Sequence, residues 1–182
     1  MFPELTYRHA AEHLWDSGAT CRITNSKPEN ISVLLAVFLE RGRRSVCIYS
    51  RYDAGVFESP VFLAGLRDAL GRPGLAIQAA IAGAPATSPL EQLAAQTHAA
   101  SFALWRGRTH PSIASFAVVD GRACRYKDKS GSSVACLNDP KTSALLAEAF
   151  DRFKVEGSQT AKLPTPPAPP SPLALEGIRV DF

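Results

Sequence analysis

The chain has 182 residues, of which 46% are hydrophobic and 20% are charged, and its formal net charge at pH 7 is +3. These values fit a soluble globular protein that is long enough to bury a core without disulfides or metal ions. The net charge is too small to indicate nucleic acid binding by itself, so only a local cluster of arginines could indicate it.

The cysteines and the amino-terminal segment bear on the cellular compartment. Cys21, Cys47, Cys124 and Cys136 are widely spaced within apolar runs and include no Cys-x-x-Cys pair, a pattern typical of reduced thiols in a core. The amino-terminal residues lack the basic and apolar regions of a signal peptide. The longest apolar run, residues 31–39, is about half as long as a membrane span. We therefore expect a cytoplasmic protein that holds no metal or cofactor and does not contact a membrane.

Patterns of helical and strand length alternate from the amino terminus to Trp105. Apolar residues spaced by three and four positions indicate helices, and short apolar runs bounded by Gly or Pro indicate strands. We expect helices over residues 7–15, 28–41, 60–70 and 89–100, strands over residues 21–24, 45–50, 75–81 and 102–105, and a loop over 51–57. This alternation predicts an α/β fold with a mainly parallel or mixed sheet and helices on both faces.

A β-hairpin is expected after these elements. Residues 112–119 are small, β-branched or aromatic and lead to the dipeptide Asp120-Gly121, which favours a tight turn, and residues 122–126 form the returning strand. A further strand is expected at residues 133–137, followed by a final helix from Asn138 to Val155. The inward side chains of this helix are expected to be Ala144, Leu145, Ala149 and Phe153.

The composition changes at Gly157. Residues 157–172 are rich in proline and are typical of an extended linker without a packed core. Residues 173–182 then carry large apolar side chains, which we expect to dock on the same domain, on a second copy or on another protein; the alternative is a loose terminus. The chain thus divides into a domain over residues 1–156, a linker and a docking peptide. The expected partner-binding residues of the peptide are Leu173, Leu175, Ile178, Val180 and Phe182.

One short motif fits a metal site. His9, Glu12 and His13 match a His-x-x-Glu-His pattern, in which the histidines of one helical face hold zinc and the glutamate acts as a base. That chemistry needs a third acidic ligand and a large surrounding domain, and this chain is short. We expect two histidines that face solvent, and no metal site.

Basic residues occur near the ends of several predicted strands, some of them beside aromatic residues. If they converge in space, they form a basic groove suited to a phosphate backbone. The alternative is an ordinary solvated surface. The residues expected to contact nucleic acid are Arg51, Tyr52, Arg106, Arg108, Arg125 and Lys127.

Residues 32–153 resemble one half of the phospholipase D-like superfamily. The resemblance rests on the alternating elements, on an apolar strand that ends in Asp120-Gly121 with a returning strand, and on a later helix of small and apolar residues that leads to Phe150. The active motif of that family is His-x-Lys-x4-Asp. Counted back from Asp120, the lysine position holds Ser115 and the histidine position holds Ile113.

These replacements bear on the chemistry that the resemblance implies. The histidine of the family attacks phosphorus, and its lysine binds the phosphate oxygens. Ile113 and Ser115 can do neither, so the resemblance implies a degenerate half without catalysis. Active members pair two such motifs, so it also implies self-association or pairing with another subunit.

The first hypothesis is therefore a catalytically inactive phospholipase D-like domain that acts as a binding or assembly subunit of a cytoplasmic complex, in contact with a nucleic acid backbone. The alternative is a divergent phosphodiesterase or nuclease that uses His110 and Asp120. His110 lies three residues ahead of the family position, and an odd offset on a strand turns a side chain to the opposite face, so this alternative requires a bulge. A protein-interaction module without a ligand is the third hypothesis.

Overall fold

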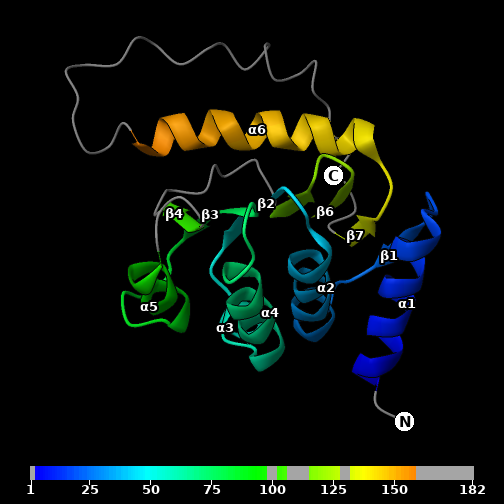
Figure 1. The fold of residues 1–182 in the computed structure, drawn as a ribbon, viewed down its shortest axis with the longest axis horizontal. Helices are drawn as coiled ribbons and strands as arrows, with labels where there is room; N and C mark the ends of the chain where they lie inside the picture. Colours follow the sequence, from blue (N-terminus) through cyan, green and yellow to red (C-terminus); the bar gives the residue numbers. More distant parts are fainter. Residues whose placement is uncertain (1–2, 98–101, 106–114, 128–131, 159–182) are drawn as a thin grey trace.

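The computed structural model describes residues 3–97, 102–105, 115–127 and 132–158 (Figure 1). The strands in these ranges form one sheet in the order β1-β7-β6-β5-β2-β3-β4. The strands are β1 (Arg22–Thr24), β2 (Ser45–Arg51), β3 (Ala76–Ala82), β4 (Phe102–Trp105), β5 (Phe116–Val119), β6 (Ala123–Lys127) and β7 (Ser133–Cys136). The helices are α1 (Pro3–Ser17), α2 (Pro28–Arg41), α3 (Ala54–Phe57), α4 (Pro60–Leu70), α5 (Pro89–Gln96) and α6 (Pro140–Ser158).

Helices cover both faces of the sheet, as the sequence predicts. Helix α6 lies across one face, and helices α1 to α5 lie on the other (Figure 1). Alternate residues of each strand point to opposite faces, so the sheet contributes to two hydrophobic clusters. One contains Val46, Ile48 and Ala117, together with apolar residues of α2 and α4. The other contains Phe116 and Val118, together with Leu146 and other residues of α6.

The sheet is mixed. Strands β2, β3 and β4 pair in parallel, because each is joined to the next through helices that cross over the sheet. Strand β5 pairs antiparallel with β2, and β6, β7 and β1 continue the sheet with antiparallel pairings. The turn at Asp120-Gly121 joins β5 to β6, and a tight hairpin of this kind can join only antiparallel strands. The predicted α/β class and mixed sheet are confirmed, with parallel pairing restricted to three of the described strands.

Helix α2 lies at the centre of the multi-helix layer. Its residues 32–39 are all buried, because α1, α3 and α4 enclose it. The contact with α4 is especially close at Gly65, where a Cβ atom would lie 3.2 Å from the Cα of Ala36. A larger side chain at this position would push the two helices apart. This packing fixes the first turn of α2, which borders the site described below.

One local prediction was wrong, and another was confirmed only in part. Part of the expected loop over residues 51–57 forms the short helix α3, since the side chain of Asp53 accepts a hydrogen bond from the Gly55 backbone N–H and starts the helix. In α6 the buried apolar side chains are Leu146 and Phe150, whereas Ala144 is exposed. Ala149 and Phe153, which were also predicted to point inward, are partly buried and pack against the same cluster. Leu146 and Phe150 lie four residues apart on one helical face, and Phe150 packs edge-on against Trp105 with ring centroids 6.0 Å apart.

Helix α6 is the last element that the structure describes. Helix α6 extends through Ser158, two residues beyond the expected domain boundary at residue 156. Most of the expected linker and the whole docking peptide, with Leu173, Leu175, Ile178, Val180 and Phe182, lie outside the described residues. None of the described helices is both long enough and apolar enough to cross a membrane.

Candidate functional site

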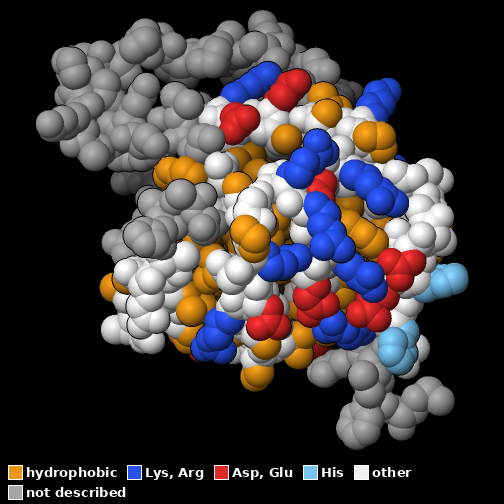
Figure 2. Space-filling view, in the orientation of Figure 1, with side chains coloured by type: hydrophobic (Ala, Val, Ile, Leu, Met, Phe, Trp, Pro, Cys, Tyr) orange, Lys and Arg blue, Asp and Glu red, His pale blue; other side chains and the backbone are white. Residues whose placement is uncertain are grey.

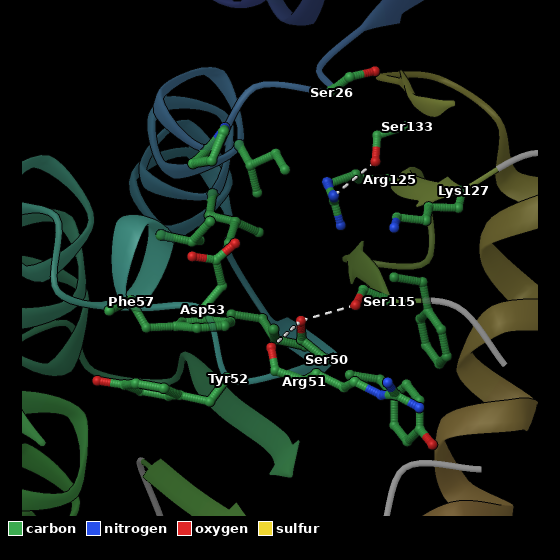
Figure 3. A pocket seen from close by; sticks show the side chains of 18 residues that line it. Ser26, Ser50, Arg51, Tyr52, Asp53, Phe57, Ser115, Arg125, Lys127 and Ser133 are labelled. Atoms are coloured by element: carbon green, nitrogen blue, oxygen red, sulfur yellow. Dashed lines mark hydrogen bonds between the residues drawn. The ribbon is translucent and has the colours of Figure 1, made fainter. Parts of the chain in front are cut away.

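A cavity of about 590 Å³ lies at the carboxyl end of β2. The end of β2, the residue before β5, the facing ends of β6 and β7, and the first turns of α2 and α3 line it (Figure 3). Ligands of open α/β sheets bind outside the carboxyl ends of the parallel strands. The position of this cavity therefore makes it the candidate functional site.

Four of the residues predicted to contact nucleic acid line this cavity. These residues are Arg51, Tyr52, Arg125 and Lys127. They come from β2, the residue that follows it, and β6, which are far apart in the sequence and separated in the sheet by β5. The remaining predicted residues, Arg106 and Arg108, lie outside the described residues, as does His110.

Arg125 occupies the interior of the sheet, where arginine is rare. Its cross-strand neighbours are Ala117 on β5 and Ala135 on β7, and both are small. These alanines leave room for a long side chain beside them, which projects into the cavity (Figure 3). Only 5% of the Arg125 surface is exposed. The small side chains on the neighbouring strands thus leave space for this guanidinium group.

The partners of Arg125 are neutral. Its Nε donates to Oδ1 of Asn25 at 3.2 Å, and its Nη2 donates to Oγ of Ser133 at 2.9 Å. Among the described residues, no carboxylate forms an ion pair with it. Burial lowers the pKa of Arg125 to about 10, so the group still carries its charge at neutral pH. A buried positive charge without a carboxylate partner favours an anionic ligand.

Other charged side chains also line the cavity and add to its positive charge. Lys127 lies two residues after Arg125 on the same strand and therefore points to the same side of the sheet, and it is exposed. Arg51 lines the cavity from the end of β2, but it follows Tyr49 by two residues and points to the opposite side of the sheet from Arg125 (Figure 3). Asp53 is the one carboxylate among the described lining residues, and it accepts a hydrogen bond at the start of α3. Three cations and one carboxylate have a formal sum of +2.

Hydroxyl groups surround these charges. Ser115, at the position of the family lysine, lies with its Oγ 2.9 Å from Oγ of Ser50, and the two share a hydrogen bond. Ser133 lies opposite Lys127 in the β6–β7 ladder. Ser26 lines the cavity just ahead of α2. The sequence gives little signal for Ser50 or Asn25, because single polar residues at strand ends are common.

Aromatic rings form another part of the wall. Tyr52 stacks on Phe57 with ring centroids 5.9 Å apart and an angle of 20° between the rings. Burial, and then its hydrogen bond to Glu58, raise the pKa of Tyr52 to about 12. Tyr49 and Phe116 also line the cavity, and their rings stack with centroids 5.2 Å apart. Such surfaces suit the bases of a single strand, although the described rings already pack on one another.

Asp120 lies at the opposite end of β5 from this cavity. It lies five positions after Ser115, which corresponds to roughly 17 Å along an extended strand. Its Oδ1 accepts from the backbone N–H groups of Arg44 and Ser45 at 2.8 and 2.9 Å, and its Oδ2 accepts from that of Arg43 at 2.8 Å. The Asp120 carboxylate thus holds β5 against the start of β2 and does not line the cavity.

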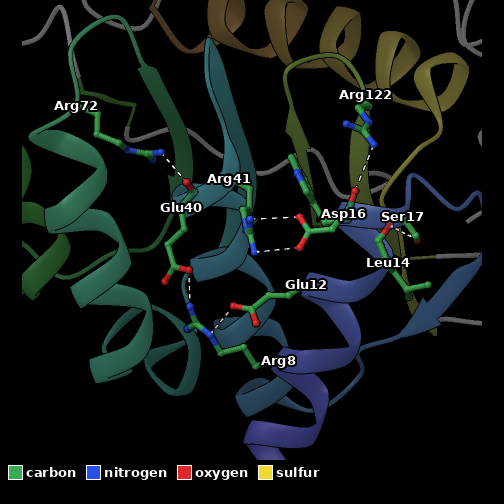
Figure 4. A network of polar contacts seen from close by, with 10 residues as sticks. Arg8, Glu12, Leu14, Asp16, Ser17, Glu40, Arg41, Arg72 and Arg122 are labelled. Atoms are coloured by element: carbon green, nitrogen blue, oxygen red, sulfur yellow. Dashed lines mark hydrogen bonds and ion pairs between the residues drawn. The ribbon is translucent and has the colours of Figure 1, made fainter.

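Other arginines differ from Arg125 in having acidic neighbours. Arg8 pairs with Glu12 and Glu40, and Arg41 pairs with Asp16 at 3.2 Å (Figure 4). Figure 2 shows Lys and Arg side chains gathered in the middle of one face of the molecule, with Asp and Glu side chains beside them.

Arg72 and Arg122 are bound to the backbone in the same region. Nη1 of Arg72 donates to the carbonyl groups of Glu40 and Gly42 at 2.7 and 3.1 Å, and carboxylates, including Asp120, lie near the guanidinium group. Arg122 lies 5.6 Å from the ring centroid of Trp15 and donates to its carbonyl group. These arginines stabilise the fold, in contrast to Arg125.

The His-x-x-Glu-His motif does not form a metal site in the described part of the chain. His9 and His13 are both exposed on α1, as expected, and Glu12 pairs with Arg8. No group of three or more His, Cys, Asp or Glu side chains suitable for a metal ion occurs among the described residues.

The fold is similar to that of several solved structures. Nuc from Salmonella typhimurium, a phospholipase D family member, has a TM-score of 0.52 at 17% identity over 69% of this chain and 87% of its own. NucT from Helicobacter pylori has a TM-score of 0.50 at 11% identity, over 75% of this chain and 95% of its own. The archaeal chromatin protein TrmBL2, described with a novel mode of DNA binding, has a TM-score of 0.56 at 13% identity, over 83% of this chain and 62% of its own.

The chain therefore has a phospholipase D-like fold, as its resemblance to that superfamily implies. No protein-family model and no curated protein sequence matches it. At these low identities the likeness is one of fold alone, and a shared fold does not determine function.

Replacing Asp120 tests its structural role. We expect Asp120→Ala to lower the free energy of unfolding by about 2 kcal/mol, because three backbone donors lose a charged acceptor. Asp120→Asn should cost less, since asparagine keeps one acceptor oxygen and tolerates the positive φ of 53° at this residue. Denaturant unfolding measures both changes. Equal stability of the wild-type protein and the Asp120→Ala variant would contradict this role.

Proposed function

We propose that this chain is a catalytically inactive phospholipase D-like domain that binds a nucleic acid backbone in the cavity around Arg125. The observation that carries the proposal is the charge of Arg125, which is buried on neutral partners beside Lys127. A phosphate oxygen matches the guanidinium donors in charge and in hydrogen-bonding geometry. Hydroxyl groups and the nearby aromatic rings can complete the contacts with a flexible strand.

The absence of a nucleophile in the family positions supports binding without cleavage. Ser115 shares its hydroxyl with Ser50, and no described histidine lines the cavity to activate it. Asp120, the remaining residue of the family motif, is occupied by three backbone N–H groups. The described residues can therefore hold a phosphate and orient it, and they offer no group to attack phosphorus.

Removing the exposed cation of the cavity tests the proposal. We expect Lys127→Ala to weaken binding to a short single-stranded oligonucleotide by about tenfold and to reduce the slope of log Kd against log salt by roughly one. Fluorescence anisotropy at several salt concentrations measures both. Lys141→Ala makes the same charge change at an exposed position that does not line the cavity, so it should leave the affinity almost unchanged.

Two results would overturn the proposal. Equal losses of affinity in the Lys127→Ala and Lys141→Ala variants would assign the binding to the overall charge of the protein. No binding of the oligonucleotide at low salt would rule out nucleic acid as the ligand. Metal-independent cleavage of the oligonucleotide that His110→Ala abolishes would establish the nuclease alternative.

We further propose that the domain serves as a subunit of a cytoplasmic complex and that the peptide over residues 173–182 docks on a partner protein or a second copy. The support is the sequence, which carries large apolar residues behind a proline-rich segment. Deleting residues 164–182 should abolish association with the partner or the second copy, measured by light scattering or co-purification. Unchanged association, with the same thermal stability, would contradict this role for the peptide.

A further inference from the structure

We infer that the cavity recognises a terminal phosphate, that is, a phosphate monoester, in preference to an internal phosphodiester of the strand. This inference rests on the proposed function and specifies its ligand. A phosphate monoester carries a charge between about −1.5 and −2 at pH 7, whereas a diester carries a single charge. The two ligands therefore differ in charge and in the number of groups attached to the phosphorus.

The charge of the site favours the monoester. Arg125 and Lys127 face the cavity from one side of the sheet, and Arg51 lines it from the end of β2 with its side chain toward the other side. Together with Asp53, the described lining residues have a formal sum of +2. Arg125 and Lys127 are two residues apart on β6, about 7 Å along the strand, and one phosphate group can lie between them. Because Arg125 lies in a poorly solvated interior, the second negative charge of a monoester is worth more there than in water.

The depth of Arg125 favours the same ligand. Only 5% of its surface is exposed, and Asn25 and Ser133 hold two of its nitrogens from neighbouring elements. An internal phosphate carries a sugar on each side, and both sugars must enter the cavity with it. A terminal phosphate carries one sugar and can reach the guanidinium group end-on. The hydroxyl groups of Ser115 and Ser133, which line the cavity, can donate to its additional oxygens.

The start of α2 adds a smaller contribution. Pro28 is the first residue of this helix and lines the cavity, and the preceding residue, Lys27, makes no side-chain hydrogen bond that caps the helix. The first-turn N–H groups of a helix carry a partial positive charge that attracts phosphate. The packing of α2 between α1 and α4 holds this end in place beside Arg125.

Oligonucleotides that differ only at one end test the inference. The probes have one sequence and carry a 5′-phosphate, a 3′-phosphate, a 5′-methyl phosphate or hydroxyl groups at both ends. We expect a phosphate at one end to tighten binding at least about tenfold relative to hydroxyl ends. The methyl phosphate, which keeps one charge at the same place, should bind nearly as weakly as the hydroxyl form.

Variants connect this preference to the site. Arg125→Met should abolish the advantage of the terminal phosphate, and its melting temperature should not fall much, because removing an unpaired buried charge offsets the lost hydrogen bonds. Arg67→Met, on the exposed surface of α4, makes the same substitution outside the cavity and should keep the advantage. If Arg125→Met fails to fold, Lys127→Ala should still reduce the advantage, because Lys127 is exposed.

The outcomes separate this inference from the proposed function. Equal affinity for all four probes, with weaker binding of each to the Lys127→Ala variant, would overturn the terminal-phosphate preference and leave backbone binding in place. No binding of any probe would overturn both. Competition experiments with a nucleoside monophosphate and with inorganic phosphate identify the source of the monoester. Competition by the nucleoside monophosphate at the affinity of the phosphorylated strand supports a small phosphorylated ligand, and much weaker competition supports a strand end.

Discussion

The carboxylate of Asp120 sets the arrangement on which the site depends. Its hydrogen bonds to the backbone of residues 43–45 join the end of β5 to the start of β2. The two strands then pair antiparallel in a single register, which brings Ser115 and Ser50 together at their other ends. Since β6 continues from the Asp120-Gly121 turn, the same interaction also fixes where Arg125 and Lys127 lie. The residue that survives from the family motif therefore acts through the fold.

The two ends of the sheet have different roles as a result. At the Asp120 end, arginines contact carboxylates, carbonyl groups and an aromatic ring, and they connect α1, α2 and the strand turns, although Nε and Nη2 of Arg72 are buried without a hydrogen-bond partner among the described residues. At the Ser115 end, Arg125 is buried with neutral partners and faces a cavity. Burying a charge without a counter-charge costs stability. A ligand that supplies the counter-charge would recover that cost, which gives a physical reason for an anion site here.

The sequence predicts most of the fold because its patterns are local. Helix α2 has a clear apolar face, and the Asp120-Gly121 dipeptide determines the hairpin, so both are readily predicted. The buried pair Leu146 and Phe150 of α6 was missed because small and large apolar residues alternate there and only the packing against Trp105 selects the face. The candidate site was predicted in part. Arg51, Tyr52, Arg125 and Lys127 all line one cavity, and their contact with nucleic acid stays a prediction. Asn25, Ser50 and Ser133 become partners only through strand order, which residue spacing does not reveal.

In the proposed complex Arg125 itself contacts the phosphate, and its Nε–H group reports this contact directly. In a proton–nitrogen correlation spectrum, the Nε–H signal of Arg125 is assigned by its loss in the Arg125→Met variant. Titration with a 5′-phosphorylated oligonucleotide should shift this signal, with a saturation curve that matches the Kd from anisotropy. An unchanged Arg125 signal, with shifts confined to exposed arginines such as Arg67, would contradict the account.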